Sequence, residues 1–124
     1  MIRLLIVAEQ ASTAHALRMR LSAESDLGVV GEVIGCEEAL GAAECLLPDI
    51  AVVDMDILRG YDATAELQLQ ALCRVMPVII LTLHEDICAR RCAAGADVAA
   101  LVSKLVPVET LLTTIRQVAR GGTD

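Results

Sequence analysis

The sequence is almost without aromatic side chains and long apolar runs. Among its 124 residues there is one tyrosine, Tyr61, and neither Phe nor Trp, so any core has to be aliphatic. The longest apolar runs, Leu4–Ala8 and Pro77–Leu81, are far shorter than the roughly 20 residues that cross a bilayer. With no linker or low-complexity tract, we expect one domain over residues 1–120, and residues 121–124 as a tail or the start of a linker.

Basic charge is also scarce. Lys and Arg number 10 against 17 Asp and Glu, which gives a net charge of −7. An acidic domain of this size repels phosphate backbones, so we expect no direct binding of nucleic acid by this chain.

The five cysteines form no CxxC pair, and their number is odd. The apolar run that follows Met1 stops at Glu9, short of an export signal. We therefore expect reduced, mostly buried thiols and a cytoplasmic protein. The spacing of His84, Cys88 and Cys92 would put them on one helix face, which we interpret as ordinary packing rather than a zinc site.

Strand-like apolar runs alternate with segments of helical spacing. Five alternating units predict an α/β fold, a flavodoxin-like (βα)5 doubly wound parallel sheet with strand order 2-1-3-4-5. The expected strands are Ile2–Val7, Val29–Ile34, Ile50–Asp54, Val78–Thr82 and Ala99–Ser103.

Helix boundaries are indicated by Pro and Gly. Pro107 is expected as the first residue of the last helix, and Gly121 is expected to stop it. A short helix over Ile87–Ala94 is expected to end with Gly95 as its C′ residue. The apolar stripe of the last helix is Leu111, Leu112, Ile115, Val118 and Ala119.

Polar residues stand where four of the predicted strands end. They are Glu9, Asp54, Thr82 and Lys104, and in this topology they meet at one edge of the sheet. Glu9 and Asp54 have oxygens suited to a hard cation such as Mg²⁺, and a backbone carbonyl near Asp56 would add another. Thr82 offers a hydroxyl and Lys104 a positive charge. The set suits formation of an acyl phosphate on Asp54.

The stretches that hold these residues are MIRLLIVAEQ, PDIAVVDMD, VIILTLHED and LVSKLVPVETLLTTIRQVARGG. In order and spacing they resemble the response-regulator receiver domain over essentially the whole chain. The LVSK-x-x-P arrangement and the VVGEV run are most similar to receivers of LuxR/NarL-type two-component regulators.

The resemblance implies a role for each site residue. Asp54 would be the phosphoacceptor, and Glu9, Asp54 and the backbone carbonyl of Asp56 would bind Mg²⁺. Thr82 would reorient toward the phosphoryl group, with Lys104 as its ion-pair partner. These roles describe a signalling domain and not an enzyme.

The resemblance also implies partners. A sensor histidine kinase would supply the phosphoryl group. DNA would be reached only through a C-terminal effector domain that is not in this chain, and homodimerisation is left open. No membrane partner is expected.

Some residues depart from the family pattern. Ala8 stands where a second acid is usual, Leu83 follows Thr82 where a small residue is usual, and no aromatic residue precedes Lys104. These departures leave an alternative, a phosphorylation-independent pseudo-receiver acting as a protein-interaction or ligand-sensing module. The presence of Asp54, Thr82 and Lys104 favours the phosphorylated receiver.

Overall fold

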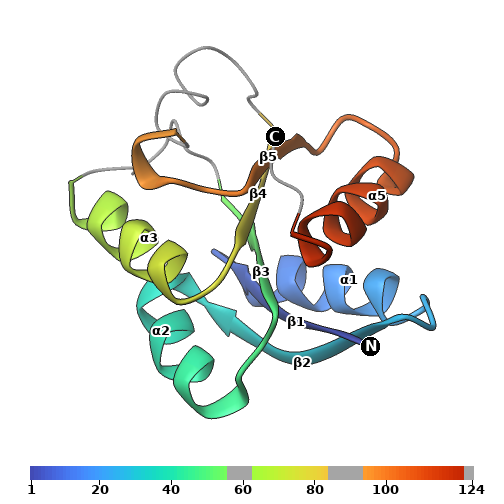
Figure 1. Ribbon diagram of the computed structural model, residues 1–124, viewed down its shortest axis with the longest axis horizontal. Coiled ribbons are helices and arrows are strands. Elements are labelled where there is room, and N and C mark those ends of the chain that lie inside the picture. The colour runs from blue at the N-terminus through green and yellow to red at the C-terminus, as the bar shows by residue number, and fades with distance from the viewer. Residues whose placement is uncertain (56–62, 84–93, 122–124) are drawn as a thin grey trace.

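The computed structural model describes residues 1–55, 63–83 and 94–121, and all that follows concerns these residues. Strands and helices alternate along them (Figure 1). In chain order they are β1 (Ile2–Ala8), α1 (Ala11–Leu21), β2 (Leu27–Ile34), α2 (Gly35–Leu46), β3 (Ile50–Asp54), α3 (Ala63–Val75), β4 (Val78–Thr82), β5 (Ala100–Ser103) and α5 (Val108–Ala119).

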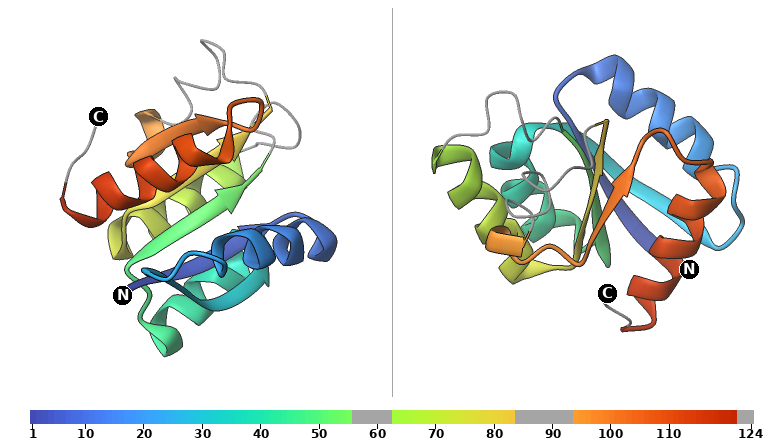
Figure 2. Two further views of the ribbon diagram at one scale, coloured as in Figure 1. Left: turned by 90° about the vertical axis from the view of Figure 1, so that its right-hand side faces the viewer. Right: turned by 90° about the horizontal axis from the view of Figure 1, so that it is seen from above.

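Within the described part of the chain, the strands form one parallel sheet in the order β2-β1-β3-β4-β5, which confirms the predicted topology. Helices α1 and α5 cover one face, and α2 and α3 cover the other (Figures 1 and 2). Each face therefore has its own aliphatic core, as a chain so poor in aromatic residues requires.

Strand β3 lies in the middle of the sheet, and all five of its residues are buried. Successive side chains of a strand point to opposite faces. Ile50 and Val52 belong to the core under α1 and α5, whereas Ala51 and Val53 belong to the core under α2 and α3. Asp54 continues the first series, so its carboxylate points to the α1/α5 side where the strand ends.

Ion pairs join helix α5 to the turn between α1 and β2. The guanidinium of Arg116 donates to both carboxylate oxygens of Asp26, at 2.8 and 2.9 Å, and to Glu24 at 3.1 Å. The bonds from Arg116 lower the pKa of the Asp26 carboxyl below its usual value, and hydrogen bonds from Arg20 first, then from Arg116, lower that of Glu24. The two carboxylates lie between α1 and β2, so Arg116 fixes α5 beside α1.

Some predicted helix boundaries were wrong by a residue or two. Pro107 precedes α5 as its N-cap, and Val108 is the first helical residue. Gly95 is itself helical, and the left-handed residue is Asp97, with φ 65°, because Asp adopts this conformation more readily than most residues. Gly121, with φ 84°, follows α5 as predicted. Ala119 is exposed, while the other four residues of the α5 stripe are buried.

The cysteines within the described ranges are less buried than expected. Cys36 and Cys73 are half-buried free thiols, and Cys45 is exposed. Burial raises the pKa of Cys73 to about 11 and also raises that of Cys36. Both thiols are therefore protonated at neutral pH. His84, Cys88, Cys92 and nearly all of the helix predicted at Ile87–Ala94 lie outside the described residues.

None of the helices in the described ranges is long and apolar enough to cross a membrane.

Candidate functional site

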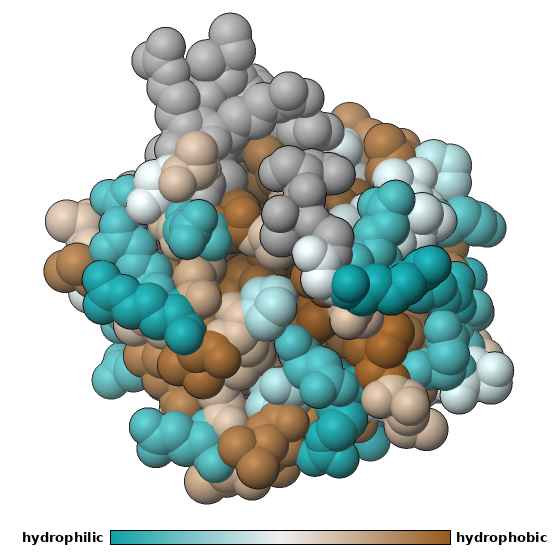
Figure 3. Space-filling view, viewed as in Figure 1, coloured by the Kyte–Doolittle hydropathy of each residue, from teal (hydrophilic) through white to brown (hydrophobic). Residues whose placement is uncertain are grey.

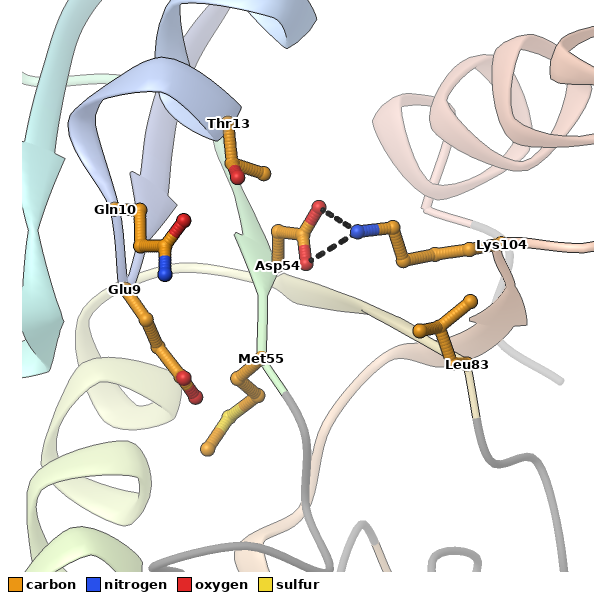
Figure 4. A pocket seen from close by; sticks show the side chains of 7 residues that line it. All are labelled: Glu9, Gln10, Thr13, Asp54, Met55, Leu83 and Lys104. Atoms are coloured by element: carbon orange, nitrogen blue, oxygen red, sulfur yellow. Dashed lines mark hydrogen bonds and ion pairs between the residues drawn. The ribbon is translucent and has the colours of Figure 1, made fainter.

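The centre of the candidate site is an ion pair between Asp54 and Lys104, residues 50 positions apart in sequence. Lys104 Nζ lies 2.8 Å from Asp54 Oδ2 and 3.0 Å from Oδ1, so it contacts both carboxylate oxygens (Figure 4). The Asp54 side chain is 10% exposed and that of Lys104 is 33% exposed. The pair is thus shielded on the carboxylate side and open to solvent on the ammonium side.

Strand ends bring these two residues together. Asp54 is the last residue of β3, and Lys104 is the first residue after β5. Strand β4 lies between them, and its Thr82 carbonyl accepts a hydrogen bond from the Lys104 backbone N–H at 2.8 Å. This bond extends the sheet by one residue at Lys104. The side-chain ammonium then lies over the end of β3.

A pocket of about 130 Å³ opens beside the ion pair. Glu9 borders it from the turn between β1 and α1, and Leu83 borders it from the end of β4 (Figure 4). Thr82 is fully buried and does not line this pocket. Asp56 lies outside the described residues. Of the residues singled out in the sequence, Glu9, Asp54 and Lys104 therefore share one pocket.

Two polar lining residues were not anticipated from the sequence. Gln10 and Thr13, at the start of α1, line the same pocket, and their polar ends point into it (Figure 4). Both follow closely on Glu9. The spacing of a helix, in which residues three apart share a face, was the signal that would have identified Thr13 once Gln10 was placed at the helix start.

Ala8 and Leu83 change the character of the pocket. Ala8 is buried and lies opposite Asp54 in the pairing of β1 with β3, so a methyl group occupies the position of the usual second acid. Leu83 is 51% exposed at the rim. The site accordingly has fewer carboxylates and a more apolar entrance than the resemblance implies.

The donor set fits a hard cation, but only weakly. No group of three or more His, Cys, Asp or Glu side chains suited to a metal occurs among the described residues. Glu9 and Asp54 still offer two carboxylates to one pocket, and Gln10 and Thr13 add neutral oxygens. These oxygens match the preference of Mg²⁺, which commonly binds through one or two carboxylates and keeps several waters, although the Lys104 ammonium already contacts both oxygens of Asp54.

Comparison with known proteins identifies the family. The response regulator receiver domain family matches residues 4–116, and the chain belongs to this family. This confirms the resemblance drawn from the strand-end residues.

Individual relatives agree with this assignment. The uncharacterized transcriptional regulatory protein YvfU of Bacillus subtilis is 39% identical over 84 residues, which are 66% of this chain and 41% of that protein. The response regulator protein VraR of Staphylococcus aureus is 28% identical over 97% of this chain and 57% of its own length. The chain thus spans about half the length of the curated relatives it matches.

A solved structure shows the same fold. The LuxR-family two-component response regulator of Aurantimonas sp. SI85-9A1 superposes with a TM-score of 0.83 over 98% of this chain and 86% of that chain, at 20% identity.

Proposed function

We propose that this receiver domain accepts a phosphoryl group on Asp54 from a sensor histidine kinase. The observation that carries the proposal is the Asp54–Lys104 pair at the rim of a pocket at the carboxyl end of the sheet. A nearly buried carboxylate with a solvent-facing cation beside it suits a nucleophile that must receive an anionic group.

The chain's own residues account for the main requirements of the transfer. A carboxylate oxygen of Asp54 forms the new O–P bond while the P–N bond of the phosphohistidine breaks, and the imidazole leaves with the electron pair. Lys104 already contacts both oxygens of Asp54, so it needs only a small movement to pair with a phosphoryl oxygen. Glu9 and Asp54 would hold Mg²⁺, which supplies positive charge when bound. Thr82 would donate its hydroxyl to the product, and the backbone carbonyl of Asp56 would complete the metal ligands.

The family and the relatives support a proposal for the output. A new charge on Asp54 would bias a small shift of β5, and so alter the outer surface. Among the curated relatives are transcriptional regulators longer than this chain. We therefore propose a transcriptional output through a C-terminal effector domain, and cytoplasmic signalling.

Intact-mass spectrometry after incubation with a small acyl phosphate and Mg²⁺ tests the phosphoacceptor. A single phosphoryl adduct is expected on the wild type and on Asp97→Asn, but not on Asp54→Asn. Asp97 is a matched control because it is exposed and does not line the pocket, and Asn tolerates its left-handed backbone. The absence of an adduct on the wild type would contradict the proposal and leave the phosphorylation-independent module.

The cation site is tested separately through Ala8→Asp. The new carboxylate would lie opposite Asp54 across two neighbouring strands, so repulsion should lower Tm in the absence of divalent cation. Mg²⁺ should then raise the Tm of Ala8→Asp by more than that of the wild type or of Ala8→Asn. No rise in the Tm of any of the three proteins with Mg²⁺ would show that Asp54 and its neighbours do not bind the ion.

A further inference from the structure

A second cavity, of about 160 Å³, lies on the other side of the Asp54–Lys104 pair. It opens between α1, α5 and the carboxyl ends of β4 and β5, and both members of the ion pair line it. On the face shown in Figure 3, apolar residues reach the surface among polar ones where α1 and α5 lie. Its walls are mainly aliphatic and include Leu17, Leu81, Val102, Val106, Pro107 and Leu111.

The cavity has a physical origin in the composition. With no Phe or Trp in the chain, the space between two helices and the sheet edge is bordered by Val and Leu side chains. An apolar cavity of about 150 Å³ is large enough to bind benzene. The walls therefore suit a single aromatic or alicyclic ring.

The polar end of the cavity limits the chemistry of a ligand. Asp54 and Lys104 together are neutral, with the carboxylate nearly buried and the ammonium one-third exposed. A hydroxyl group can donate to an Asp54 oxygen and accept from the Lys104 ammonium at the same time. A carboxylate would be attracted by Lys104 but repelled by Asp54, and an amine the reverse, so a charged group gains no net attraction from the neutral pair.

We propose that this cavity binds a small uncharged molecule with a ring-sized apolar body and one hydroxyl group, of the phenol class. The ring would lie against Val102 and Leu111, and the hydroxyl would bridge the ion pair. Such a ligand would give the domain a second input that needs no phosphoryl transfer. The proposal therefore stands or falls independently of the phosphoacceptor role of Asp54.

Phenol is the probe, and the readout is a ¹H–¹⁵N chemical-shift titration without phosphoryl donor or Mg²⁺. Shifts are expected at the backbone amides of Leu17, Val102 and Val108, with a Kd of about 1 mM, as expected for so few ligand atoms. Val106→Phe should weaken binding at least tenfold by placing a ring at the half-exposed mouth of the cavity. Val75→Phe makes the same change at an exposed site outside the cavity and should bind like the wild type.

Each remaining outcome overturns the proposal. Shifts that do not map to the cavity amides, or binding unchanged in Val106→Phe, would place phenol elsewhere. Benzoate or cyclohexylamine binding more tightly than phenol would contradict the neutral hydroxyl ligand. No shift up to 20 mM phenol, well above the expected Kd of about 1 mM, would show that the cavity is not a ligand site. The wild-type shift map decides the question even where a variant fails to fold.

Discussion

The coupling between Asp54 and Lys104 is the most direct quantity to measure at the site. Two unit charges 2.8 Å apart attract by about 1.5 kcal/mol in the dielectric of water and by about 6 kcal/mol at an effective dielectric constant of 20. Lys104 is one-third exposed, so solvent screening, desolvation and lost side-chain freedom offset most of the larger figure. We expect a net coupling of about 2 kcal/mol.

A double-mutant cycle isolates this coupling. Lys104→Met keeps most of the aliphatic stem and removes the charge, whereas Asp54→Asn keeps the shape and removes the charge. The two single changes should not be equal. Loss of the lysine leaves a carboxylate that is only 10% exposed without its partner, while loss of the carboxylate leaves an ammonium that can turn into solvent. Lys104→Met should therefore be the more destabilising substitution.

Urea unfolding of the four proteins at pH 7 gives the free energies for the cycle. Lys104→Met should lower the free energy of unfolding by about 2 kcal/mol more in the wild-type background than in Asp54→Asn. A difference below about 0.5 kcal/mol would refute the reasoning, because it would mean that the ion pair has little net effect on the fold.

Two further predictions concern the rest of the fold. Arg116 lowers the pKa of Asp26 in the folded state, so their ion pair stabilises the fold at neutral pH. This contribution is lost as the pH falls below the pKa of unfolded Asp, about 3.9, and through the lower pKa of Asp26 in the folded protein. Arg116→Met should thus lower Tm at pH 7 but much less at pH 2, and a deficit independent of pH, measured by circular dichroism, would contradict the pairing. In β2, a Cβ on Gly31 would lie 2.7 Å from Cδ1 of the half-buried Leu46, which can move, and 3.3 Å from Cδ1 of the fully buried Leu5, so Gly31→Ala should cost about 1 kcal/mol in urea unfolding. Gly41 is exposed on helix α2, and a Cβ there would meet no neighbouring side chain within 4 Å, so Gly41→Ala should instead stabilise the fold by about 0.5–1 kcal/mol. If both substitutions changed the free energy of unfolding in the same direction, the packing argument would be refuted.

The sequence predicted the central strands best. Ile50–Asp54 and Val78–Thr82 were predicted with their observed bounds because each is a short apolar run buried on both faces. The same reasoning placed Asp54 and Lys104 at one edge, since the order of strands decides which ends meet. Contacts between individual side chains could not be predicted by this reasoning. Arg116 and Asp26 are 90 residues apart, and no periodicity relates them.

Helix starts and pocket linings were predicted less well. Pro107 suits both the residue before a helix and its first residue, so composition alone left the boundary uncertain by one position. Gln10 and Thr13 carry no charge and belong to no distinctive motif. Their place in the pocket follows from the start of α1 directly beyond the carboxyl end of β1, which only the fold shows.

The substitution at Ala8 acts on the site in two opposing ways. A second carboxylate opposite Asp54 would strengthen a cation site, so its absence weakens one. The same absence lowers the repulsion that an incoming phosphoryl group meets, by about 3 kcal/mol per unit charge for charges 5 Å apart at an effective dielectric constant of 20. Glu9, Asp54 and Lys104 leave the described lining of the pocket with a net charge of only −1. Loss of the second acid is therefore compatible with phosphoryl transfer that depends less on the cation and more on Lys104.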